Sequence, residues 1–187
     1  MQVSFGKGNG MVFSLNDKVV YPGHGVALIS KIFSRSVARQ TIVFYELQFQ
    51  NKDMTIMVPC NRFNEVGIRP LSSSSKINSM LEAIAEPAKK AKSLETSCVN
   101  WNRRNKEYQS KLRNGSLEDI SEIYSDLKYI SKFKELSFGE KNLLLKTESL
   151  LVEEISAAEQ VDEEKAVERL RSIFIHRGSY QTPSRAL

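Results

Sequence analysis

The fold of the first part of this chain is decided by the stretch Lys18-Val19-Val20-Tyr21-Pro22-Gly23-His24-Gly25-Val26-Ala27-Leu28-Ile29. Its two ends are rich in branched apolar residues, which favour extended strands. Between them, Gly23 and Gly25 permit positive φ angles and so mark a tight turn. The stretch therefore predicts two strands, residues 18–21 and 26–33, joined by a glycine turn.

Three further strand candidates follow, at residues 42–49, 54–58 and 68–71. The sequence Asn51-Lys52-Asp53 reads as a hairpin connection between the first two of them. Five short strands at this spacing predict a small antiparallel β-barrel of the SH3 or Tudor kind.

The pattern changes near residue 75, and every candidate element after it is helical. Leu71–Lys76 is rich in serine and reads as a linker or a helix-initiating loop. Capping signals stand at Ser116, which has an acid three residues on, and at Ser137, which forms a capping box with Glu140. The expected helices cover residues 77–85, 100–113, Ser116 to Ile130, Ser137 to Ile155, and 162–174.

The sequence thus predicts an α+β protein of two domains. A Tudor/SH3-like antiparallel barrel at residues 13–71 is followed by an all-α bundle of about five helices at residues 76–175. Residues 1–12 are expected to form an N-terminal extension. Residues 176–187 carry no apolar stripe and are expected to form a flexible tail.

The composition is that of a folded protein, with 41% hydrophobic and 26% charged residues in a chain of 187. No apolar run approaches the roughly 18 residues of a membrane span, and no leader pattern opens the chain. A cytoplasmic protein without a membrane partner is therefore expected. Cys60 and Cys98 have no CxxC spacing, so both are expected to be reduced and structural.

Positive charge is concentrated around the single tryptophan, Trp101. The net charge is +5, but residues 89–113 contain eight Lys or Arg and two Glu, whereas residues 137–165 contain eight acids and three bases. Cations beside a large ring suit a nucleic-acid partner, because the cations bind phosphates and the ring stacks on exposed bases. A lone tryptophan on a helix is usually a core anchor, since its burial removes much apolar area. The local pattern leaves both readings open.

Catalytic and cofactor signatures are absent from the sequence. No HExxH, GxSxG, Walker-type or GxGxxG motif occurs, and the two histidines are isolated. The acidic pairs Glu153-Glu154 and Glu163-Glu164 are expected on solvated helix faces. The sequence therefore gives no reason to expect an enzyme, a cofactor or a metal site.

Five motifs in order resemble the CarD/CdnL family of bacterial transcription regulators. The first is the opening strand and YPxHG turn, and the others follow along the chain: Phe13 to Gly25, Met54-Thr55-Ile56-Met57-Val58-Pro59, Val66-Gly67-Ile68-Arg69, Asn100-Trp101-Asn102-Arg103-Arg104 and Leu136-Ser137-Phe138-Gly139-Glu140-Lys141. Each motif is short, but their order across residues 13–160 makes the resemblance specific.

The resemblance implies a function. The barrel would bind the RNA polymerase β subunit, and the helical domain would lie on promoter double-stranded DNA at the upstream edge of the bubble. The tryptophan would wedge into the minor groove at that junction and stabilise the open complex. The implied DNA contacts are Trp101, Arg103, Lys106 and Lys141. The implied polymerase contacts are Arg35 and Met57, which stands where some members have a basic residue.

A second class of function is compatible with the same residues. A stand-alone, non-specific DNA-binding architectural protein would use the barrel only as a scaffold. Polymerase binding separates the two hypotheses, because the architectural protein would show none. A monomer is expected in either case.

Overall fold

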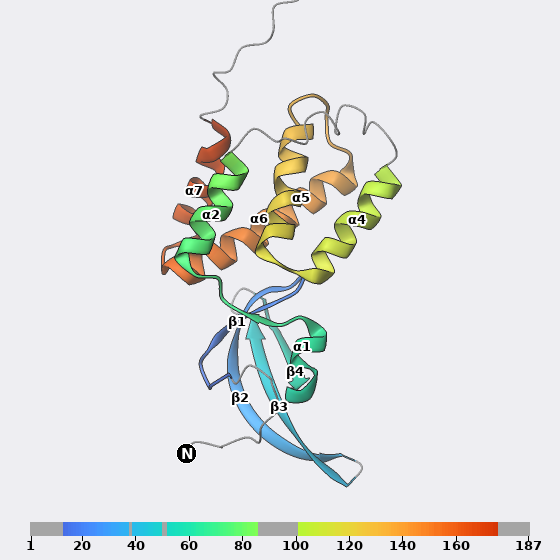
Figure 1. The fold of residues 1–187 in the computed structure, drawn as a ribbon, viewed down its shortest axis with the longest axis vertical. Helices are drawn as coiled ribbons and strands as arrows, with labels where there is room; N and C mark the ends of the chain where they lie inside the picture. Colours follow the sequence, from blue (N-terminus) through green and yellow to red (C-terminus); the bar gives the residue numbers. More distant parts are fainter. Residues whose placement is uncertain (1–12, 38, 50–51, 86–100, 176–187) are drawn as a thin grey trace, which may run out of the picture. The chain divides into compact units, whose positions relative to one another are not determined.

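The computed structural model describes residues 13–37, 39–49, 52–85 and 101–175 (Figure 1). The chain divides into two compact units. The first contains the described residues up to Tyr21 and Val26–Pro70, and the second contains Pro22–Gly25 and the described residues from Leu71 onward. Each unit is described by itself below.

The first unit is a five-stranded antiparallel sheet. Its strands are β1 (Lys18–Tyr21), β2 (Gly25–Val37), β3 (Gln40–Phe49), β4 (Met54–Pro59) and β5 (Arg69–Pro70). Their order is β4-β3-β2-β1-β5, so β4 and β5 are the end strands. With helices following the sheet, the predicted α+β class in two regions is confirmed.

The core of the β unit follows from alternation along the strands. Successive side chains of a strand point to opposite faces. Accordingly Ala27 and Ile29 of β2, and Tyr45, Leu47 and Phe49 of β3, are buried on one face.

A short helical segment after β4 closes one side of this core. It consists of the 3-10 helix η1 (Cys60–Arg62) and α1 (Phe63–Val66), which ends at Gly67 with a left-handed φ of 80°. The Phe63 ring lies 5.0 Å from the rings of both Phe13 and Tyr45. The sequence pattern does not predict this segment, because a single helical turn is too short to show a helical period of apolar residues.

The second unit contains five helices in its described part. They are α2 (Ser74–Ala85), α4 (Trp101–Asn114), α5 (Leu117–Ile130), α6 (Phe138–Glu159) and α7 (Glu163–Ile175). Both predicted caps are confirmed: the Ser116 side chain accepts from the Asp119 amide, and Ser137 and Glu140 form a complete capping box. The Ser73 hydroxyl also accepts from the Lys76 amide, so the serine-rich loop initiates α2.

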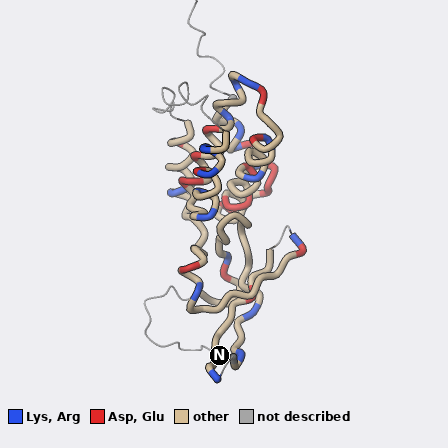
Figure 2. Tube along the Cα trace, turned by 90° about the vertical axis from the view of Figure 1, so that its right-hand side faces the viewer, with Lys and Arg blue, Asp and Glu red and all other residues tan. Residues whose placement is uncertain are grey.

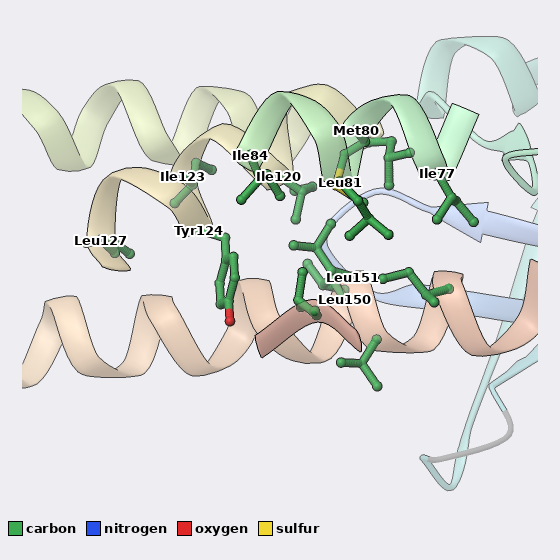
Figure 3. Packing of buried hydrophobic residues seen from close by; sticks show 14 of the residues in the cluster. Ile77, Met80, Leu81, Ile84, Ile120, Ile123, Tyr124, Leu127, Leu150 and Leu151 are labelled. Carbon is green, nitrogen blue, oxygen red and sulfur yellow. The ribbon is translucent and has the colours of Figure 1, made fainter. Parts of the chain in front are cut away.

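The core of the helical unit is one cluster drawn from all five helices, part of which is shown in Figure 3. Tyr124 of α5 is fully buried, and its hydroxyl points toward α6 and donates to Glu148 Oε1 at 3.0 Å. Arg171 Nε donates to the same oxygen at 2.7 Å. Burial, helped by the Glu148 carboxylate, raises the pKa of Tyr124, so the hydroxyl remains a hydrogen-bond donor. The buried Tyr124 hydroxyl and the buried Glu148 carboxylate are thus paired, as a stable core requires.

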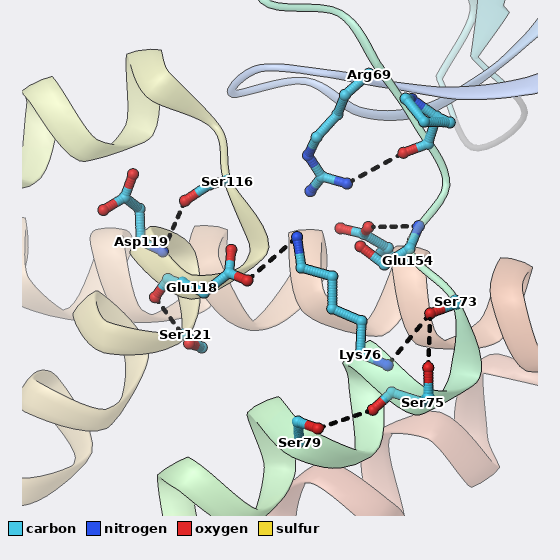
Figure 4. A network of polar contacts seen from close by, with 12 residues as sticks. Arg69, Ser73, Ser75, Lys76, Ser79, Ser116, Glu118, Asp119, Ser121 and Glu154 are labelled. Atoms are coloured by element: carbon cyan, nitrogen blue, oxygen red, sulfur yellow. Dashed lines mark hydrogen bonds and ion pairs between the residues drawn. The ribbon is translucent and has the colours of Figure 1, made fainter.

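The expectation that Glu153-Glu154 lies on a solvated face is wrong for Glu154. This side chain is buried and accepts the Ser72 amide at 3.2 Å, as Figure 4 shows. In the same view, Lys76 Nζ lies 3.1 Å from Glu118 Oε1. Glu154 therefore has a structural role, because its carboxylate accepts a hydrogen bond from the backbone amide of Ser72, just before α2.

Some sequence expectations fall outside the described residues. They are the extension at 1–12, the tail at 176–187, Asn51, Cys98 and the cationic residues between 89 and 100. Cys60 is a free, partly buried thiol. Within the described ranges, no helix is both long and apolar enough to cross a bilayer.

Candidate nucleic-acid and protein interfaces

Trp101 is the first residue of α4 and is partly buried against the helical core. At 3.6 residues per turn, it shares the inward face of α4 with the buried residues Tyr108 and Leu112. A Cβ built on Gly139 of α6 would lie 3.1 Å from the Trp101 ring atom Cζ2. The ring therefore packs closely on the start of α6, and a side chain at position 139 would push it back by a few tenths of an ångström. The ring is thus partly buried, so it is packed on the core and still partly accessible to solvent.

Glu140 ties the first turns of α4 and α6 together. Its side chain is 1% exposed, and Arg104 Nη2 donates to Glu140 Oε1 at 2.8 Å. Lys134 Nζ reaches the same oxygen at 3.1 Å, while the Ser137 amide donates to Glu140 Oε2 at 2.9 Å. One carboxylate thus caps α6 and holds a cation of α4, three residues from Trp101.

These contacts decide the protonation state of Glu140. Burial acts to raise the pKa of its carboxyl, but the hydrogen bonds from the Ser137 amide, Lys134 and the Ser137 hydroxyl more than offset it and leave the pKa lowered. The group is therefore a carboxylate at neutral pH, as the pairing with Arg104 requires.

Only some of the cations of α4 face solvent. Arg104 is taken by Glu140, and Lys111 is partly buried beside Glu107 and Glu122, at 3.4 and 2.9 Å. Arg103 and Lys106 are exposed, and within the described ranges neither makes an ion pair. Figure 2 shows positive and negative residues interspersed along the helical unit. The two α4 cations named from the sequence as DNA contacts are thus among those available to phosphates.

Lys141, the fourth predicted DNA contact, lies in the first turns of α6 and is exposed. Its Nζ donates to Glu135 Oε1 at 2.7 Å, and this hydrogen bond is the main cause that lowers the pKa of Glu135. Both side chains are solvated, and exposed pairs of this kind contribute little stability. A phosphate can therefore compete with Glu135 for the Lys141 ammonium.

Arg35, the predicted polymerase contact, is exposed near the end of β2. Its guanidinium carbon lies 5.2 Å from the centroid of the Phe33 ring. Phe33 pairs directly across from Phe44 of β3, and their rings stack with centroids 5.9 Å apart. The cation is therefore held over the Phe33 ring, which restricts a long, flexible side chain before any partner binds.

Met57, the other predicted polymerase contact, lies on the end strand β4. Its side chain is 52% exposed, and its register partner is Glu46 of β3. An exposed methionine on an end strand suits a protein partner, because it is apolar and adapts its shape.

Two exposed aromatic side chains on the helical unit were not singled out from the sequence. They are Phe133, between α5 and α6, and Phe138, the first residue of α6. Apolar periodicity does not find such residues, because it reports the buried face of a helix. One sequence signal could have found Phe138. It directly follows the capping residue Ser137, and this places it at the end of a helix.

The chain thus consists of a β unit and a helical unit, each with exposed cations and apolar side chains. In the described ranges, no group of three or more His, Cys, Asp or Glu could hold a metal ion. Two family models match the chain in order, "CarD-like/TRCF RID domain" over residues 13–72 and "CarD, C-terminal domain" over residues 82–171. The chain belongs to the CarD family.

A curated relative agrees with this family. The chain is 23% identical over 154 residues to "Putative transcription factor YdeB" of Bacillus subtilis (strain 168), a match that covers 82% of this chain and 97% of that protein. The family is one of transcription regulators that interact with RNA polymerase, and it is not known as a family of enzymes.

Proposed function

We propose that this protein stabilises the open promoter complex by binding RNA polymerase through its β unit and promoter DNA through its helical unit. The polymerase partner is the β subunit, bound by Arg35, Met57 and the edge of β4 through strand addition. The DNA partner is the double strand at the upstream edge of the bubble. The protein then works in the bacterial cytoplasm, on the nucleoid.

The observation that carries the DNA side of the proposal is the position of Trp101. Its ring packs on Gly139 at the start of α6, which also bears the exposed Lys141. The exposed cations Arg103 and Lys106 follow on the same helix as the ring. A ring that enters an unstacked base step opposes re-pairing, and neighbouring cations hold it there through phosphates.

The energies needed are small. About 1.4 kcal/mol of preferential binding to the open state changes the ratio of open to closed complexes tenfold. A few phosphate contacts and one ring are enough for an effect of this size.

The direct test is the lifetime of open complexes formed by RNA polymerase on a promoter, with a competitor added to trap released enzyme. The full-length protein is expected to lengthen that lifetime. An unchanged lifetime with measurable polymerase binding would reject the proposal. DNA binding without any polymerase binding would instead support the architectural alternative.

Arg35→Glu is expected to weaken polymerase binding by at least about tenfold, because it places a negative charge where a pre-positioned cation stood. Its exposure predicts an unchanged melting temperature. The matched control is Arg62→Glu, an equal charge change at another exposed arginine of the β unit. Equal losses in the two variants would show a general charge effect and remove Arg35 from the interface.

Lys106→Gln is expected to lower DNA affinity to a similar degree on unrelated sequences. It should reduce the slope of log K against log salt by about 0.9, the effect of one lost phosphate contact. Lys111→Gln is the control on the same helix, since its ammonium is already held by two glutamates. If Lys111→Gln changes the slope as much as Lys106→Gln does, the exposed face of α4 is not the phosphate-binding surface.

A further inference from the structure

Phe138 is the most exposed large hydrophobic residue of the described chain, with 81% of its surface accessible. It is the first residue of α6, directly after the capping residue Ser137. The capping box fixes the backbone at this point, so the ring is presented from a rigid helix end. A solvated phenylalanine gains free energy from any contact that removes its ring from water.

Helix geometry places Phe138 between the tryptophan contact and a cation. Residues follow one another around α6 at about 100° each, so Gly139 and Lys141 lie on opposite flanks of Phe138. Trp101 packs at Gly139, with its Cζ2 atom 3.1 Å from the position of an added Cβ. Around the start of α6 the surface therefore runs from the Trp101 ring, past the Phe138 ring, to the Lys141 ammonium.

We propose that Phe138 is a second aromatic contact, which stacks on an unpaired base beside the step that Trp101 enters. This inference rests on the proposed function and assigns to it a residue that the family motifs do not single out. The two rings would make different contacts with the DNA. Trp101 is partly buried and fixed by packing, whereas Phe138 is free to meet a base over its whole face.

The chemistry of the surroundings favours a nucleobase as the occupant. The exposed Lys141 ammonium on one flank pairs with the solvated Glu135, and a phosphate can replace that carboxylate. A base attached to the same backbone would then lie within reach of a ring on the same helix turn. Every base has a π-face, so aromatic stacking needs no particular sequence. A promoter bubble supplies unpaired bases at its edge, which a closed duplex does not.

The experiment compares the full-length protein on two labelled DNA probes, a duplex ending in an unpaired arm and a fully paired duplex of the same length. Phe138→Ala is expected to lower affinity for the forked probe at least about fivefold, since one base-to-ring stack has about that effect. Affinity for the paired duplex should change by less than about twofold, as for an ordinary surface substitution. Phe138→Leu, which keeps an apolar side chain but no ring, should lose most of the same preference.

The matched control is Leu145→Ala. Leu145 lies two turns along the same face of α6 and is 62% exposed, so its truncation removes a similar apolar contact away from Trp101. It should leave both affinities within about twofold of the parent protein. A thermal melt of each variant checks that the helical unit remains folded.

The other outcomes each overturn the inference in a recognisable way. If Trp101→Ala weakens fork binding and Phe138→Ala does not, the inference fails and the proposed function stands. If the parent protein shows no preference for the fork and Trp101→Ala has no effect, the proposed function fails as well. A loss of polymerase binding alone would assign the ring to a protein partner. A change in sedimentation with Phe138→Ala would assign it to a second copy of the chain.

Discussion

Trp101→Ala is expected to shorten the lifetime of the open complex about tenfold, which corresponds to roughly 1.4 kcal/mol of lost preference for the open state. Polymerase binding should not change, because the polymerase contacts are proposed for the β unit. The ring is only partly buried. The variant should therefore lose less than the about 3–5 kcal/mol that truncating a fully buried aromatic costs.

The contrast for this variant is Tyr108→Ala on the same helix face. Tyr108 is 3% exposed, so its truncation is expected to cost the full core penalty and to lower the melting temperature sharply. A Trp101→Ala variant that melts like Tyr108→Ala, yet supports a normal open-complex lifetime in its folded fraction, would show that the ring is a core anchor only.

Glu140→Gln is expected to destabilise the helical unit by about 3 kcal/mol, the lower end of the cost of removing one partner of a buried ion pair. The substitution leaves the Arg104 guanidinium, whose side chain is only 14% exposed, without its counter-charge, although an amide oxygen can still accept from the Ser137 amide. Thermal unfolding measures the loss. Glu135→Gln is the control, because that carboxylate pairs with Lys141 in full contact with solvent. Equal melting shifts in the two variants would contradict a special role for the buried pair.

The same carboxyl gives a pH dependence with a definite sign. Its pKa is lowered in the folded state, so the unfolded state binds more protons between the two pKa values and stability rises with pH there. The contribution of Glu140 is therefore complete above its unfolded pKa of about 4.5 and is lost as pH falls through the folded value. The parent protein should lose stability more steeply than Glu140→Gln in that acid range.

Most helices and strands could be predicted from the sequence, because the signals that specify them lie within a few neighbouring residues. The glycine turn, the alternating strands and the two serine caps each act over a few residues, and each element formed where it was expected. The extent of β2 is an exception that depends on cross-strand partners. β2 continues to Val37 although Ser34-Arg35-Ser36 is polar, because Arg35 and Ser36 pair with Ile42 and Thr41 of β3. No pattern within one strand reports such a pairing.

The candidate site was predictable in its residue types but not in its connections. Counting charge treats Arg103, Arg104 and Lys106 alike, whereas the structure gives Arg104 to Glu140 and leaves the other two exposed. The capping box identified Glu140 as a helix cap, but its second role requires a cation from another helix. Phe138 was missed for a similar reason. Its importance comes from Trp101, which packs on the adjacent Gly139, and not from the local sequence pattern around Phe138.

The close packing of Trp101 on Gly139 also constrains how this protein can change over generations. A methyl group at position 139 would lie 3.1 Å from the indole, so the ring would have to shift by a few tenths of an ångström. A larger residue at 139 therefore favours a smaller or displaced ring at 101, and a displaced ring would alter the surface proposed to meet DNA. The two positions are far apart in the sequence but are coupled by this contact. We therefore expect relatives to keep both residues or to replace both together.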